Sequence, residues 1–269
     1  KTEPLARDTV FAAVMICTTG IVGLSLLAAS RRDTIATFNS DGTTTALATV
    51  ATLAGLTLVV PQFTTSKPGP EFTAGQLAFA AIASIVLYSS FVFVQAIRHR
   101  DYFLPAKGAA DDHADPPSGR AAAVSAGLLF VSLIAVVGRA KLESKPIEDA
   151  VTSIGAPQSA VGVLIALLVL APETLAAVRN ARRGRMQVSF NLALGSALAS
   201  IALTIPAIAL ASIWIDGPLV LGLQPMQMAL LFITMIVSVL TIVPGRATLQ
   251  EAAVHLTLFG SFLFFALNP

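Results

Sequence analysis

The segment VLAPETLAAVRNARRGRMQVSFNLALGSALASIALTIP, residues 169–206, decides the fold of this chain. It consists of two long apolar stretches joined by a short basic turn around Gly184. With the apolar residues that precede and follow it, each stretch reaches the length of about 20 residues that a helix needs to cross a bilayer. Because the turn is so short, the two helices must be antiparallel neighbours. The segment therefore predicts a membrane protein built from helices.

Apolar runs of similar length recur along the whole chain of 269 residues, of which 55% are hydrophobic and only 12% are charged. A soluble domain carries about 25% charged residues, so most of the surface of this chain must face lipid. We predict an all-α, polytopic membrane protein with about eight transmembrane helices. The predicted spans are residues 8–29, 44–60, 74–97, 120–137, 158–178, 188–213, 225–243 and 249–267.

The longest polar break, AKGAADDHADPPSG at residues 106–119, is acidic and rich in Pro and Gly, as flexible linkers are. It separates a three-helix part from a five-helix part. Lysine and arginine are more frequent in the loops at one end of the predicted bundle, including the turn at 179–185, so this end is predicted to be cytoplasmic. Both chain ends then lie outside, and an odd number of helices upstream of Lys1 would explain that orientation.

A weak internal similarity links the third predicted span with the last. LYSSFVFV at residues 87–94 resembles LFGSFLFF at residues 258–265, and the two lie on helices of opposite direction. Inverted repeats of this kind are typical of transporters. The alternative is a chance similarity between two aromatic-rich apolar helices.

Glu173 is the residue most suited to chemistry, because it lies deep in the fifth predicted span directly after Pro172. A charged, unpaired carboxylate at this depth costs several kcal/mol, so it must be protonated, paired or bound to a metal ion. Pro172 removes one backbone donor and is expected to free carbonyl groups one turn earlier. The next helix offers the oxygens of Asn191 and Ser196, and Gly195 is expected to let the two helices approach closely.

Carboxylate, amide, hydroxyl and carbonyl oxygens together suit hard cations such as Ca²⁺, Na⁺ or Mg²⁺. A buried glutamate also holds a proton readily when the cation leaves, so one residue can serve two competing ligands. We therefore predict a cation site formed by Glu173, Asn191 and Ser196. The alternative is that Glu173 only forms an ion pair with Arg179 or Arg182 near the end of its helix.

Three further polar residues are candidates for a proton or cation pathway: Asp8, Glu251 and His255. Asp8 and Glu251 lie at the starts of predicted helices, where an acid is also favoured by the helix dipole alone. His255 follows Glu251 by one helical turn and has a buried structural histidine as its alternative. The single cysteine, Cys17, is expected to be a small core residue.

No catalytic motif accompanies these residues. The sequence shows no nucleophile motif near its three histidines, no phosphate-binding glycine loop and no histidines at metal-binding spacing, so we expect neither an enzyme nor a cofactor. The absence of a basic patch with interleaved aromatic residues argues against nucleic acid as a partner. The expected partners are the lipid bilayer, small cations and protons, and the sequence leaves open a homo-oligomer.

Four segments resemble a known family: PIEDAVTSIGAPQSAVGVLIALLVLAPETLAA (146–177), NLALGSALASIALTIP (191–206), LYSSFVFVQAIRHRDYF (87–103) and GRATLQEAAVHLTLF (245–259). They are similar to the cation/proton exchanger group of the calcium/cation antiporter superfamily, and most of all to its bacterial calcium(sodium)/proton antiporters. In this resemblance the first segment contains the acid of the second α-repeat, which is Glu173, and the second segment is its partner helix.

The resemblance implies two inverted repeats of about five helices, each contributing one glutamate to the ion site. Residues 1–105 then form the rest of the first repeat with three helices, 106–119 the linker, 120–155 a connecting helix with an interfacial segment, and 156–269 the second repeat with four helices. Residues 6–30 look like the second helix of the first α-repeat. The helix that carries the first repeat's glutamate is therefore expected upstream, in a protein of about eleven helices. By the same symmetry, Asp8 falls opposite Asn191.

These observations predict a secondary active antiporter that exchanges Ca²⁺, with Na⁺ or K⁺ as alternatives, for H⁺ across a bacterial cytoplasmic (inner) membrane. Glu173 would bind cation and proton in turn. The alternative is a channel, or a membrane protein without transport activity, in which Glu173 is a structural ion-pair residue.

Overall fold

A computed structural model describes residues 5–104, 157–214 and 219–268, together with short pieces between residues 118 and 131. Seven helices in the described residues are long and apolar enough to cross a membrane, and each coincides with a predicted span. The remaining predicted span, 120–137, lies mostly outside the described residues, and its described residues are helical. Nearly all of the predicted linker, 106–119, and of the interfacial segment that follows the span also lies outside them.

The first half of the described chain contains three spans, two of which are continued by short π- or 3₁₀-helical turns. Its elements are α1 (Leu5–Met15), η1 (Ile16–Ile21), α2 (Val22–Ser30), β1 (Ala36–Thr37), α3 (Ser40–Ala54), η2 (Gly55–Val59), η3 (Val60–Phe63), α4 (Ala74–Phe93), η4 (Val94–Arg98) and η5 (Arg100–Phe103). The second half contains four spans. Its elements are α6 (Gln158–Arg182), α7 (Met186–Ala211), α8 (Pro225–Ile242), β2 (Arg246–Ala247) and α9 (Leu249–Leu267).

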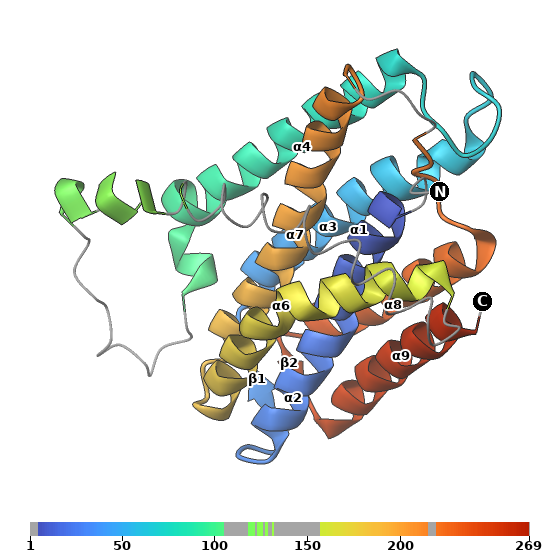
Figure 1. Cartoon of the computed structure of the whole chain (residues 1–269). Coiled ribbons are helices and arrows are strands. Elements are labelled where there is room, and N and C mark those ends of the chain that lie inside the picture. The colour runs from blue at the N-terminus through green and yellow to red at the C-terminus, as the bar shows by residue number, and fades with distance from the viewer. Residues whose placement is uncertain are drawn as a thin grey trace.

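The helix formed by α1, η1 and α2 is the centre of the fold. It packs against α6, α7 and α9, as Figure 1 shows. The buried share of this span is 89%, the largest among the described spans. A helix that is apolar all round and buried all round belongs inside a bundle rather than at its lipid face. The segments that surround it therefore share it as a common packing partner.

At each end of the bundle, one loop of the first half of the chain pairs with one loop of the second half. At one end the loop between α2 and α3 pairs with the loop between α8 and α9, where β1 lies antiparallel to β2. At the other end the loop between α3 and α4 pairs with the loop between α7 and α8, through a bridge between Glu71 and Val220. At each end the earlier of the two loops in one half thus pairs with the later loop in the other half, which is what a pseudo-two-fold axis in the membrane plane produces.

The starts of α4 and α9 support the same symmetry. Thr73 and Thr248 each cap their helix, in a capping box with Gln76 and with Glu251 respectively. The two threonines are 175 positions apart, whereas the similar segments 87–94 and 258–265 are 171 positions apart. The similarity seen in the sequence is thus out of register with the structural repeat by about one helical turn.

Basic residues gather at the end of the bundle where β1 and β2 pair. The turn between α6 and α7 contains Gly184 in the left-handed region (φ +74°), and a Cβ there would lie 3.1 Å from the guanidinium of Arg32 in the loop after α2. Two of the loops predicted to be cytoplasmic therefore lie together, as the distribution of positive charge requires.

Candidate cation site

Glu173 lies on the inner face of α6, which runs unbroken through Pro172. It shares a helical stripe with Leu170, Ala177 and Ala181, all of which are buried. Residues on the other side of the helix, such as Leu168 and Leu175, are exposed as a lipid-facing surface would be. The helix thus points the Glu173 carboxylate into the bundle because its apolar face, with larger side chains, turns outward.

One oxygen of the Glu173 carboxylate has no partner in the described part of the chain. Its Oε2 atom is buried and has no hydrogen-bond partner among the described residues. Within the same residues neither Arg179 nor Arg182 forms an ion pair with it, and both arginines are exposed. The structural ion pair considered as an alternative is therefore not present. A buried carboxylate oxygen without a partner needs a proton or a cation.

The π-helical segment η1 lies on the side of α6 that carries Glu173. It packs against α6, and all of its residues, Cys17 included, are buried. Two hydroxyls fix this segment from within, because Thr18 donates to the Val14 carbonyl (2.7 Å) and Thr19 to the Met15 carbonyl (2.5 Å). Single π-turns inside longer helices occur frequently at functional sites. No pattern in the sequence predicted this irregular turn.

A cavity of about 500 Å³ lies between α1, α6 and α7. Its lining includes Leu170, one turn before Glu173, and the hydroxyl-bearing residues Thr9, Ser200 and Thr204. The cavity lies in the half of the bundle away from the basic turn after α6. It therefore lies between that end of the bundle and the turn of α6 that precedes Glu173.

Asn191 is engaged in a different set of contacts. Its amide nitrogen donates to the Phe103 carbonyl (2.6 Å), and its oxygen accepts from Gln187 (3.1 Å). Gln187 also donates to Thr43 and accepts from the backbone N–H of Asn39. These contacts tie the start of α7 to α3, and the predicted role of Asn191 in the cation shell stays a prediction.

Ser196 is half-buried, and its role as a cation ligand also stays a prediction. The expectation for Gly195 is wrong, because a Cβ there would meet nothing within 4 Å. On α6, Gly162 permits a close approach, because a Cβ there would lie 3.1 Å from the backbone of Asp8 and Thr9. Gly162 thus brings α6 against α1 rather than against α7.

Asp8 forms a buried ion pair with Arg7 (2.8 Å) near the start of α1. It also accepts a hydrogen bond from Gln227 of α8 (3.3 Å), while Arg7 donates to the Gly222 carbonyl (3.3 Å). Asp8 therefore links α1 to the start of α8 at the end away from the basic turns. A role in a proton or cation pathway stays a prediction.

Glu251 and His255 are not joined by a hydrogen bond in the structure. The Glu251 carboxylate accepts from the Thr248 backbone and hydroxyl, so it caps α9, the alternative given for it from sequence. His255 is fully buried and bonds to the Thr18 carbonyl and to Thr241. Its contacts place it beside η1.

The ligands that a cation at Glu173 could use depend on which side chains lie near one another in the described ranges. The described part of the chain contains no group of three or more such residues that could hold an ion. A cation at Glu173 would therefore depend on hydroxyl and carbonyl oxygens and on water for its remaining ligands, which is chemistry that hard cations accept.

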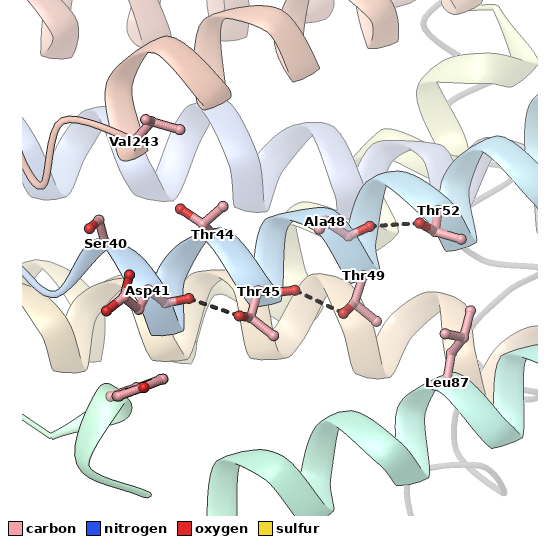
Figure 2. Close-up of a pocket in the computed structure, with 10 residues that line it drawn as sticks. Ser40, Asp41, Thr44, Thr45, Ala48, Thr49, Thr52, Leu87 and Val243 are labelled. Atoms are coloured by element: carbon pink, nitrogen blue, oxygen red, sulfur yellow. Dashed lines mark hydrogen bonds between the residues drawn. The ribbon is translucent and has the colours of Figure 1, made fainter. Parts of the chain in front are cut away.

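A second cavity, of about 820 Å³, follows one face of α3 (Figure 2). Asp41, Thr44, Thr45, Thr49 and Thr52 line it, and the view shows the hydroxyls of Thr45, Thr49 and Thr52 bonded to carbonyls one turn earlier. The lining includes no residue of α6, so this groove is separate from the Glu173 site.

Comparison with known proteins finds two bacterial transporters that are similar to this chain over nearly its whole length. The chain is 44% identical over 267 residues to the putative ionic transporter y4hA of Sinorhizobium fredii, a match that covers 99% of this chain and 73% of that protein. It is 32% identical over 263 residues to the sodium-potassium/proton antiporter ChaA of Escherichia coli, covering 96% of this chain and 71% of the relative. The relatives named here are transporters rather than enzymes.

The fold has solved counterparts too. The structure of the H⁺/Ca²⁺ exchanger CAX matches with a TM-score of 0.70 at 15% identity, covering 97% of this chain and 65% of that one. The model of the sodium/calcium exchanger protein family matches residues 4–97 and 124–268 of this chain. The chain is thus an all-α, multi-pass membrane protein that belongs to the sodium/calcium exchanger family, within the calcium/cation antiporter superfamily.

Proposed function

We propose that this protein is a secondary active antiporter that exchanges Ca²⁺ for H⁺ across the cytoplasmic (inner) membrane of a bacterium, with Na⁺ and K⁺ as the alternative cations. Glu173 binds the cation and the proton in turn. The observation that carries the proposal is the Oε2 atom of Glu173, which is buried on the inner face of α6 and has no hydrogen-bond partner among the residues that the structure describes.

Electrostatics explains why such a residue exchanges two ions rather than binding one. Inside a membrane the charged carboxylate is costly unless it is neutralised. A proton and a metal cation both neutralise it, and they compete for the same oxygen atoms. Release of one therefore favours capture of the other, which is the coupling that an antiporter needs.

The relatives support the proton as one of the two ions. The name of ChaA describes sodium, potassium and protons, and that of CAX describes calcium and protons. Since both exchange a metal cation for H⁺, the proton is the shared partner and the metal cation differs. An oxygen-lined site accepts all three cations, so each must be tested.

The test is cation-driven proton movement in everted membrane vesicles that contain the full-length protein. Addition of Ca²⁺, Na⁺ or K⁺ should collapse a preformed pH gradient, which a pH-sensitive dye reports. Glu173→Gln removes the charge but keeps the shape of the side chain, and we expect it to reduce this exchange to the level of empty vesicles. Glu173→Asp keeps the charge and should retain part of the activity.

Glu71→Gln is the matched control, because Glu71 forms an ion pair with Lys67 in a loop outside the candidate site. It should exchange at the wild-type rate. Exchange by Glu173→Gln at the wild-type rate would show that the proposal is wrong. Cation flux through the wild-type protein without proton movement would instead indicate a channel.

A further inference from the structure

Helix α9 lies unusually close to the central helix, because two glycines face it. A Cβ at Gly20 would lie 3.1 Å from the Phe259 ring, and a Cβ at Gly23 would lie 2.9 Å from Leu256 and 3.1 Å from the Cβ of His255. Small residues at a helix interface allow backbones to approach, as is common in membrane proteins. The contact brings the backbone of η1 within reach of the His255 ring.

Both nitrogens of the buried His255 ring are engaged. Nδ1 lies 2.9 Å from the Thr18 carbonyl oxygen, and Nε2 lies 3.0 Å from the Thr241 hydroxyl. A carbonyl oxygen can only accept, so Nδ1 carries a hydrogen and donates it to Thr18. In the neutral ring Nε2 then accepts from the Thr241 hydroxyl. The two bonds fix the orientation of the ring.

The carbonyl that His255 holds belongs to the segment opposite Glu173. Thr18 belongs to η1, which packs against α6, the helix that carries Glu173. His255 and Thr241 come from α9 and α8, in the second half of the chain, whereas η1 belongs to the first half. The contact therefore joins the two halves at the level of the candidate cation site.

We infer that His255 is a positioning residue for cation exchange: it holds η1 in place opposite Glu173, while Thr241 fixes its ring. The inference rests on the proposed function for its effect on transport, but the structural contact can be tested without transport. It requires no change of charge on the ring. Glu251, one turn earlier on α9, is engaged in capping its own helix.

The first test compares three substitutions in the vesicle assay. The amide nitrogen of His255→Asn lies close to the place of Nδ1 and can still donate to Thr18, whereas the longer His255→Gln reaches toward the place of Nε2. We expect His255→Ala and His255→Gln to raise the cation concentration for half-maximal exchange about tenfold, as loss of a buried hydrogen bond does. His255→Asn should stay within about threefold of the wild type.

Thr257→Ala is the matched control on α9, because Thr257 is exposed and its hydroxyl donates to the carbonyl of Ala253 on the same helix. It should leave the half-maximal concentration unchanged. A merely structural histidine would give three variants with equal loss of protein and no difference in half-maximal concentration. That result, or wild-type values for all three, would overturn the inference.

The second test does not depend on transport. Cys17 is fully buried beside Thr18, so a small maleimide should label it slowly in the wild type. His255→Ala should label at least about tenfold faster, since η1 is no longer held, and His255→Asn should label slowly. Mass spectrometry of the Cys17 peptide gives the rates. Equal labelling rates in all variants would overturn the inference, even if Glu173 proves essential for exchange. The expected labelling rates in a wild-type protein that shows no cation/proton exchange would count against the proposed function alone.

Discussion

Single residues on α6 set how Glu173 meets the rest of the bundle. Gly162 lies against the backbone of Asp8 and Thr9, so α6 can approach α1 without a side chain between them. Glu173 lies about three turns further along the same helix and faces inward with Ala177. The position of the carboxylate thus depends on a residue that has no chemistry of its own.

We expect Gly162→Val to lower the melting temperature of the detergent-purified protein and to reduce exchange, because its Cβ alone would lie 3.1 Å from backbone atoms that cannot move aside. Overpacking of this kind costs about 1–3 kcal/mol. Gly195→Val in α7 is the control, since a Cβ there meets nothing within 4 Å and should leave the melting temperature nearly unchanged. Equal effects of the two substitutions would contradict the packing seen here.

Helices α3 and α8 occupy equivalent places in the two halves, but they expose different faces. On α8 the exposed residues include Phe232, Ile236 and Leu240, as expected for contact with lipid. On α3 the corresponding exposed stripe contains Asp41, Thr45 and Thr52, which line the groove in Figure 2. Since hydroxyls and a carboxylate are poor neighbours for acyl chains, this face of α3 is suited to water rather than lipid.

We expect Thr45→Cys, in a background with Cys17→Ala, to react with a membrane-impermeant thiol reagent added from the cytoplasmic side. Ile236→Cys on the exposed face of α8 is the control and should not react, because a thiol in lipid is not ionised and the reagent cannot reach it. Mass spectrometry of the labelled protein measures both. An unreactive Thr45→Cys would mean that lipid or another helix covers the groove.

In the described part of the molecule, the segments before and after residues 105–156 pack around one central helix and pair their loops at both ends of the bundle. Loop pairing at one end joins β1 to β2, and the equivalent pairing at the other end joins Glu71 to Val220. The basic turn after α6 lies at the first of these ends, near Arg32. The distribution of positive charge therefore predicts that this end faces the cytoplasm.

This orientation predicts the side from which exposed loop residues react. Arg183→Cys, in the turn after α6, should be labelled by an impermeant maleimide in everted vesicles and protected in intact spheroplasts. Ser66→Cys, in the loop between α3 and α4, should show the opposite pattern. Both positions are exposed, so access depends on the side of the membrane alone. The reverse pattern would invert the predicted topology.

The sequence by itself determined the class of fold, the seven described spans and Glu173 as the candidate residue. Membrane insertion depends on local composition, because a run of apolar residues either reaches the length of the bilayer or does not. A carboxylate within such a run is conspicuous for the same reason. Even the family resemblance depended on contiguous segments such as 146–177 and 191–206.

Only the tertiary structure decided which residues meet. It replaced Gly195 by Gly162 as the site of close approach, placed Asn191 in contacts with Gln187 and Phe103, and brought His255 to the Thr18 carbonyl. These contacts join residues far apart in the chain, and their geometry depends on how far each helix rotates about its axis. Nearly uniform apolar sequences leave that rotation undetermined, because lipid and protein interior are equally favourable to an apolar side chain.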